Sequence, residues 1–232
     1  DGHIRVLTGR AGNLPVGWLG EQLLLRQSGA AETGFAVSPP PYTTTVPLAL
    51  PEPPESGAFA CEPGGGLCAF VSAAGGKVWV GKFPGEAFEC VLEEGGATGR
   101  PCITSQGAVL VFTRRGAVHE FSGASGAWSR KTLLDLGHAV EKQRFSPDGT
   151  TVAWQEEARG RLTASPLDSF APAVVRLGES CVDFDWQDAS TLVCLTRANE
   201  WQLPGRFHAV YTLQRIDMST GSASAAARFP SS

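Results

Sequence analysis

The chain has 232 residues, of which 18% are charged, and its formal net charge is −4. This charge supplies no basic field for a phosphate backbone, so the composition argues against nucleic acid as a partner. No apolar run approaches the roughly 18 residues of a membrane-spanning helix, and residues 1–9 lack the basic start and apolar core of a signal peptide. We therefore expect no membrane insertion.

Short apolar segments joined by tight turns recur along the chain, and its 28 Gly and 16 Pro residues indicate many such turns. The recurring turn positions are spaced 46, 41, 42 and 41 residues apart: Gly20, Gly66, Gly107, Gly149 and Ser190. Unrelated hairpins would not keep that step. A period of about 40–45 residues is typical of β-propellers.

Each repeat predicts two strands flanking the turn, a third strand rich in β-branched and aromatic residues, and a fourth strand after a polar turn. In chain order, the predicted strands are 16–18, 23–25, 34–37 and 44–48; 59–61, 67–71, 77–80 and 88–92; 102–103, 109–112, 117–121 and 128–133; 144–145, 152–154, 161–164 and 173–177; and 184–186, 192–195, 209–213 and 224–229.

Four strands in each repeat correspond to one propeller blade, which must bury its apolar faces against neighbouring blades. We predict an all-β fold, with residues 1–232 forming a single domain, a β-propeller of about five four-stranded blades. The predicted blades cover residues 12–56, 57–97, 98–137, 138–178 and 179–230, and residues 1–8 form a closing or orphan strand.

Three other structures compete with this one. One is a β-sandwich, which is also built from short apolar strands. Another is an open arc cut from a larger propeller, which would show the same four-strand repeat. A helix over residues 129–143 would fit the spacing of the leucines there, but Gly137 weakens it by about 1 kcal/mol relative to Ala. We predict a strand followed by a loop in that segment.

Residues 144–154 read Arg-Phe-Ser-Pro-Asp-Gly-Thr-Thr-Val-Ala-Trp, with a turn in which Pro147 fixes φ, Asp148 bonds its own backbone and Gly149 takes positive φ. This segment resembles the repeat signature of TolB-type (WD-like) β-propellers. Residues 62–72 look like a drifted copy without the Asp, and the first and third repeats depart from the pattern. The resemblance implies a propeller, in which an N-terminal strand often closes the ring, and it implies no chemistry.

The six cysteines include no C-x-x-C pair, and several lie in apolar runs: Cys61, Cys68, Cys90, Cys102, Cys181 and Cys194. We expect free core thiols in a reducing compartment, and hence an intracellular, cytoplasmic location. The alternative is one or two disulfides in a secreted protein.

No catalytic or metal-binding constellation is apparent, and no cofactor is expected. The four histidines are scattered, and residues 123–127 are predicted to form a hairpin turn and not a nucleophile elbow. Asp183 and Asp185 lie on one face of a predicted first strand, as the paired acids of a propeller glycosidase would. The alternative interpretation is that both carboxylates bond the backbone at a blade edge.

The best binding candidate is an enlarged loop predicted at residues 197–207, with Trp201, Pro204, Arg206 and the adjoining His208 as binding residues. Trp and Arg are enriched in binding hot spots. Trp201 could instead fold back on its own blade. The proline-rich segment 38–56 is either a polyproline surface for a partner or a stiff connection between blades.

These features favour a noncatalytic protein–protein interaction or scaffold module that binds partner proteins through loops on one propeller face. Two alternatives stay open because fold alone does not select a function. One is the propeller domain of a prolyl-oligopeptidase-like peptidase without its hydrolase domain. The other is a propeller glycosidase.

Overall fold

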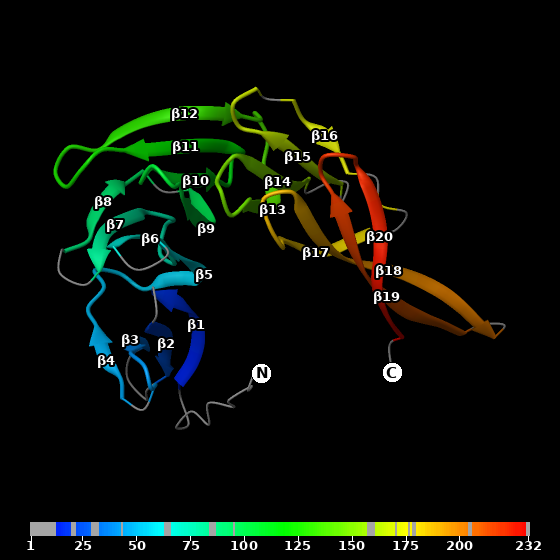
Figure 1. The fold of residues 1–232 in the computed structure, drawn as a ribbon, viewed down its shortest axis with the longest axis horizontal. Helices are drawn as coiled ribbons and strands as arrows, with labels where there is room; N and C mark the ends of the chain where they lie inside the picture. The colour runs from blue at the N-terminus through cyan, green and yellow to red at the C-terminus, as the bar shows by residue number, and fades with distance from the viewer. Residues whose placement is uncertain are drawn as a thin grey trace. The chain divides into compact units, whose positions relative to one another are not determined.

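The computed structural model describes residues 13–19, 22–28, 33–42, 44–62, 66–83, 87–94, 96–156, 161–169, 171–175, 177, 180–203 and 206–230. These residues form twenty strands in five four-stranded sheets, each built from four strands consecutive in the chain (Figure 1). Within these ranges, no helix has the length and apolarity required to span a bilayer.

The strands of the first two sheets are β1 (Asn13–Leu19), β2 (Gln22–Ser28), β3 (Thr33–Ser38) and β4 (Val46–Leu48), then β5 (Pro54–Cys61), β6 (Gly66–Ser72), β7 (Val78–Phe83) and β8 (Glu89–Leu92). Those of the third and fourth are β9 (Ala97–Ile103), β10 (Val109–Thr113), β11 (Ala117–Ser122) and β12 (Ser129–Asp135), then β13 (Val140–Phe145), β14 (Thr151–Glu156), β15 (Leu162–Pro166) and β16 (Ala173–Val174). The fifth contains β17 (Ser180–Trp186), β18 (Thr191–Leu203), β19 (Arg206–Asp217) and β20 (Ser222–Pro230).

The predicted fold is confirmed: the chain is an all-β protein of the β-propeller type, and its described residues form five four-stranded blades. Every predicted strand overlaps an observed one, and residues 129–143 begin with β12 and a loop, as predicted, although β13 already starts at Val140. The proposed closing strand at residues 1–8 lies outside the described residues. It therefore stays a prediction, as does the single domain.

The turn of the fourth sheet explains why the period is visible in the sequence. The Ser146 amide donates to the Thr151 carbonyl at 2.8 Å, and the Thr151 amide donates to Ser146 Oγ at 3.0 Å. Asp148 Oδ1 accepts the amide of Thr150 at 3.2 Å, and Gly149 has a φ of 72°. The turn motif is thus held by its own side chains.

The same backbone bond closes the corresponding turns of other sheets, where different side chains replace Ser146. Glu62 Oε2 accepts the Leu67 amide at 3.2 Å in the second sheet, and Thr104 Oγ1 accepts the Ala108 amide at 3.1 Å in the third. In the fifth sheet, Asp188 Oδ1 accepts a hydrogen bond from the Thr191 amide at 2.7 Å. The third repeat therefore keeps the turn although its sequence departs from the motif.

The chain divides into two compact units, residues 1–103 with 123–128, and residues 104–122 with 129–232. In the first unit, the first two sheets bury apolar side chains against each other. Phe70 of β6 is fully buried, and its ring centroid lies 5.7 Å from that of Phe59 and 5.3 Å from that of Phe88. The buried residues of this cluster are Leu24, Phe35, Val37 and Cys68.

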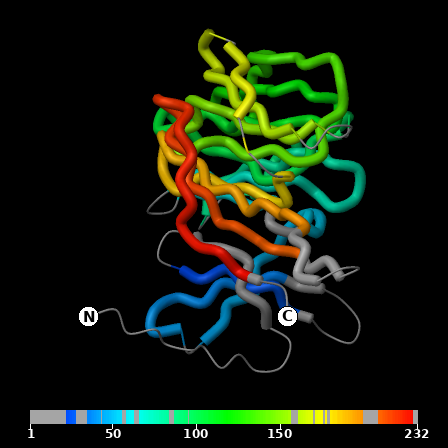
Figure 2. The backbone as a smooth tube through the Cα atoms, turned by 90° about the vertical axis from the view of Figure 1, so that its right-hand side faces the viewer, coloured from blue at the N-terminus to red at the C-terminus, as the bar shows by residue number. Residues whose placement is uncertain are grey.

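In the second unit, alternate residues of β14 pack against different neighbours. Val152 and Trp154 join Phe112 and Val118 of the third sheet, whereas Ala153 joins a cluster with the fifth sheet. This alternation follows from the period of two in a strand, which places successive side chains on opposite faces. Both faces of the fourth sheet are therefore covered, as stacked blades require. Figure 2 shows the strands of the fifth sheet, orange to red, side by side.

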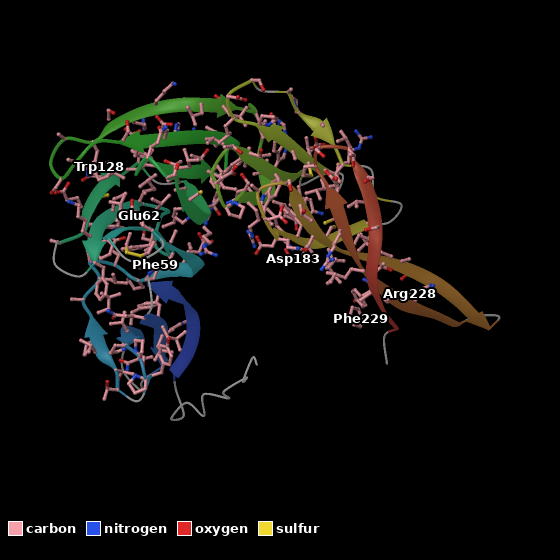
Figure 3. The ribbon with its side chains drawn as sticks, in the orientation of Figure 1. Phe59, Glu62, Trp128, Asp183, Arg228 and Phe229 are labelled. Carbon is pink, nitrogen blue, oxygen red and sulfur yellow. A yellow bond between two sulfur atoms is a disulfide. The ribbon has the colours of Figure 1, made fainter. Side chains whose placement is uncertain are left out.

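One prediction about the cysteines is wrong. Cys61 and Cys68 form a disulfide, visible as the yellow bond near Phe59 and Glu62 in Figure 3. They are direct partners in the register of β5 and β6, with Cα atoms 4.1 Å apart. Cys68 is fully buried, as its apolar neighbours in the sequence indicated, but a buried cysteine can still form a disulfide. The other four cysteines are not in disulfides.

Candidate functional site

The fifth sheet contains a hairpin that is longer than its neighbouring strands. β17 pairs with β18 only as far as Ser180 with Arg197, and β20 pairs with β19 only as far as Pro230 with Val210. Beyond these limits β18 and β19 pair only with each other among the described residues, and this projecting end is visible in Figure 1. We call it the ribbon; its pairs are Asn199–Ala209, Glu200–His208, Trp201–Phe207 and Leu203–Arg206.

The ribbon corrects the loop predicted at residues 197–207, because β18 continues to Leu203 and β19 begins at Arg206. Three predicted binding residues, Trp201, Arg206 and His208, belong to the paired strands of the ribbon. Pro204 lies outside the described residues. The structure thus brings three of the four candidates into one backbone element, and their role in binding stays a prediction.

A groove in the second unit is a feature that the sequence did not indicate. Its volume is about 980 Å³, and it lies between the first turn and strands β10, β11 and β12 of the third sheet and two turns of the fourth. Leu110, Glu120 and Lys131 line one side; they are register partners across β10, β11 and β12. Asp148 and Leu167 line the other side. The 42-residue spacing between Gly107, at the first turn of the third sheet, and Gly149, at the first turn of the fourth, was the available signal, since it predicts neighbouring positions for these two turns.

The groove combines carboxylates and hydroxyls with apolar patches, so it could hold a polar ligand with an apolar side. Burial raises the pKa of Asp148, but hydrogen bonds donated by Ser146 and Thr150 outweigh burial and keep that pKa below its usual range. Because its oxygens accept bonds from its own turn, Asp148 is a structural residue of the groove wall.

The two aspartates considered for a glycosidase bond the backbone. Asp183 Oδ1 accepts the amide of Phe184 at 3.1 Å and lies 3.4 Å from Lys142 Nζ, and Asp185 Oδ1 accepts the amide of Trp186 at 2.9 Å. Asp183 is labelled in Figure 3. These contacts match the structural interpretation of the pair, in which both carboxylates hold the edge of a blade.

The segment considered as a nucleophile elbow is held as a turn. Ser125 Oγ donates a short hydrogen bond to Glu89 Oε1, and the Gly126 amide donates to Glu89 Oε2 at 2.8 Å. The hydrogen bond from Ser125 is the main reason why the pKa of Glu89 is lowered. With the Ala127 amide donating to the Ala124 carbonyl at 2.9 Å, these bonds hold the segment in the hairpin turn that the sequence predicted.

No group of three potential ligands for a metal ion occurs within the described ranges. His119 lies on β11, where its Nδ1 is 3.1 Å from Thr132 Oγ1 and its ring packs edge-on against Phe121. Burial lowers the pKa of His119, which favours the neutral ring. The residue is part of a blade face, opposite Val111 and Thr132 in the register of the third sheet.

The proline-rich segment 38–56 is tied to the second sheet at one end. The Ala73 amide donates to the Pro53 carbonyl at 2.9 Å, and Lys77 Nζ lies 2.5 Å from Glu52 Oε1. Among the described residues between the end of β3 at Ser38 and the start of β5 at Pro54, the strand formed is the three-residue β4 at the edge of the first sheet. These contacts favour the interpretation of this segment as a connection between blades.

No protein-family model matches the sequence, and no curated protein matches it. Solved structures do: hydrazine synthase of Kuenenia stuttgartiensis has a TM-score of 0.65 at 14% identity, over 99% of this chain and 70% of that one. TolB from Acinetobacter baumannii has a TM-score of 0.60 at 14% identity, over 91% of this chain. The match covers 52% of TolB, so this chain spans about half of its length.

The β-propeller domain of Cps50 (Swd1) from Myceliophteria thermophila has a TM-score of 0.54 at 14% identity, over 83% of this chain and 69% of that one. The structural neighbours are thus β-propellers, with TolB and a WD-like propeller among them. Identity this low establishes the fold and leaves function to the residues of this chain.

Proposed function

We propose that this chain is a noncatalytic protein-interaction module on a TolB-type propeller, and that it binds a partner protein through the ribbon of β18 and β19. One observation supports this proposal most directly. The hairpin continues for four pairs, from Asn199–Ala209 to Leu203–Arg206, beyond the last residues at which β17 and β20 pair with it.

A two-stranded hairpin without a sheet neighbour is at best marginally stable in water. Its outer edges present backbone amides and carbonyls that a further strand can pair with. A partner that adds a strand to such an edge gains main-chain hydrogen bonds, with side-chain pockets supplying specificity. The ribbon therefore gains stability from binding, which is a physical reason for a propeller to contain it.

The composition of the ribbon agrees with this role. Trp201, Arg206 and Phe207 lie within seven residues of one another, and aromatic residues and Arg are enriched at protein interfaces. Trp, Tyr and Arg are also enriched among binding hot spots. Pro204 and His208 complete the proposed contact set.

The assignment to the TolB-type repeat rests on the turn motif at residues 144–154 together with the structural likeness to TolB. Asp148 and Gly149 fill the roles that the motif predicts, since one accepts amides within the turn and the other has positive φ. The other sheets close the same turn with other side chains, so the repeat is kept in its hydrogen bonding.

The test uses the tagged full chain and an extract of its source cells. In the test variant, residues 199–209 are replaced by Asn-Gly, which joins Ala198 to Val210 by a two-residue hairpin turn. We expect the intact chain to retain a stoichiometric protein and the shortened chain to lose it. In a binding titration with that protein, Trp201→Ala should weaken affinity about 30-fold, as a hot spot of about 2 kcal/mol does.

Val174→Ala is the matched control, because Val174 is an exposed apolar residue of β16 in the neighbouring sheet and is 54% accessible. It should leave binding unchanged. Equal retention of the partner by the intact and shortened chains, with both showing the far-ultraviolet circular dichroism of a folded β protein, would exclude the ribbon as the binding element.

A further inference from the structure

Two buried cysteines of the fifth sheet lie unusually close together. The sulfur atoms of Cys181 on β17 and Cys194 on β18 are 2.8 Å apart. A disulfide bond is about 2.05 Å long, so this distance is longer than a bond but short for two sulfurs that merely touch. Cys181 is 6% exposed and Cys194 is fully buried.

A β-bulge explains how these two side chains meet. Phe184 pairs with Cys194, and Asp183 pairs with Leu195. The next residue of β18, Thr196, pairs with Cys181, so Val182 is an extra residue in β17 without a partner in β18. In a regular strand, residues 181 and 184 would lie on opposite faces, because side chains alternate. The bulge restores Cys181 to the buried face of Phe184 and Cys194.

The surroundings of the two sulfurs are apolar. Both belong to the cluster between the fourth and fifth sheets, with Ala153, Leu162 and Ala164 across from them. The Cys181 carbonyl accepts a buried hydrogen bond from Gln155 Nε2 at 3.0 Å, which joins this point of β17 to the fourth sheet. A bond between the sulfurs would therefore be shielded from reductants once the sheets have packed.

Electrostatics assign different roles to the two thiols. The hydrogen bond from Cys194 lowers the pKa of Cys181, and it does so against the effect of burial. The same hydrogen bond and burial raise the pKa of Cys194. Lys142 adds to the asymmetry, since its Nζ lies 2.7 Å from the Val182 carbonyl beside Cys181. In the packed sheets, Cys181 is thus the thiol that ionises first.

We propose that Cys181 and Cys194 are an oxidation site and form a second disulfide of the chain, by exchange with a small-molecule disulfide such as oxidised glutathione. The thiolate of either cysteine displaces one thiol from the donor, and the thiolate of the other cysteine then displaces the second. Two protein thiols and one donor disulfide thereby become one protein disulfide and two donor thiols. Because both sulfurs are buried in the folded chain, this exchange occurs before the two sheets pack.

The proposal has a consequence for location. Protein disulfides form and persist in oxidising compartments and are rare in the cytosol. Together with the Cys61–Cys68 disulfide, a bond at this site favours the secreted alternative over the cytoplasmic location expected from the sequence. Cys90 provides an internal comparison, because it is half-buried, its sulfur bonds the Leu92 carbonyl at 3.4 Å, and burial raises its pKa.

The test maps disulfides in the full chain after refolding of the reduced protein in glutathione buffer, followed by alkylation and tryptic digestion. Cys181 and Cys194 fall on one peptide, residues 177–197, and Cys90 and Cys102 on another, residues 83–114. We expect the first peptide to bear no alkyl group and to be lighter than its reduced form by two hydrogens. The second should bear two alkyl groups.

A second measurement follows the bond through stability. A disulfide between Cys181 and Cys194 closes a short loop and should stabilise the chain by about 3 kcal/mol. Loss of this bond should lower Tm by about 6–12 °C in Cys181→Ala, in Cys194→Ala and in the double variant alike, since each variant removes the same bond. Cys90→Ala is the control and should leave peptide 177–197 bonded. Two alkyl groups on peptide 177–197 at the highest concentration of oxidised glutathione, or under conditions that form Cys61–Cys68, would overturn the proposal.

Discussion

Phe112→Ala tests whether packing between neighbouring sheets stabilises this chain. Phe112 of β10 is 1% exposed and packs against the fourth sheet, with its ring 6.5 Å from that of Phe145. Removing the ring forfeits about 2–3 kcal/mol of burial. A residual cavity of roughly 80 Å³ adds about 2 kcal/mol. We expect unfolding free energy to fall by about 3–5 kcal/mol, measured by urea denaturation with tryptophan fluorescence.

Phe229→Ala is the matched control, because Phe229 of β20 belongs to the same unit and is 51% exposed (Figure 3). It loses at most half of the burial energy and leaves no cavity, so its cost should be about 1 kcal/mol. The reasoning is refuted if the two variants lower the urea midpoint equally. It is refuted also if Phe112→Ala costs no more than an exposed residue does.

Three further predictions use the same urea assay. Gly116→Ala should cost at least twice as much as Gly137→Ala, because both have positive φ but only the added Cβ at Gly116 overlaps the His138 carbonyl; equal costs would contradict this. Ser146→Ala should cost about 1–3 kcal/mol, because it removes the acceptor of a turn amide; an unchanged midpoint would count against that bond. A hydrogen bond from Ser219 lowers the pKa of Asp217, so the stabilisation by its carboxylate is present above the ordinary Asp pKa of about 3.9 and is lost as pH falls through the lowered value. Asp217→Asn should therefore lower the midpoint at pH 7 and not at pH 2, and a loss independent of pH would argue against this role.

The blades could be predicted because each turn leaves local evidence in the sequence. Pro147, Asp148 and Gly149 act within one turn, and the apolar residues on either side must alternate to cover both faces of a sheet. These are short-range constraints, so one sequence suffices to read them. Five turns spaced 41 to 46 residues apart then predict five sheets.

The ribbon was missed because its residues were taken for a loop. Arg197, Asn199 and Glu200 are polar, and polar residues in a strand with no sheet neighbour need not alternate with apolar ones. A signal was nevertheless present, since Pro204-Gly205 is a turn dipeptide flanked on both sides by Trp201 and Phe207. Equal lengths of strand on both sides of such a dipeptide indicate a hairpin.

The cysteine contacts could not be predicted for a different reason. Cys61 and Cys68 meet because of the register of β5 and β6, and Cys181 meets Cys194 because of a single inserted residue. Register and bulges depend on how complete strands fit together, and a slip of one residue moves every side chain to the other face. The groove likewise depends on the placement of two sheets.

The disulfide of the second sheet has a consequence for handling the protein. Cys61 and Cys68 lie on either side of the first turn of that sheet, so cleavage of the chain between them would leave both pieces covalently joined without reductant. A protease site engineered there would yield a nicked protein whose two pieces separate in a denaturing gel only after reduction. The same position suits a two-fragment version of the propeller, in which reassembly is reported by the return of one bond.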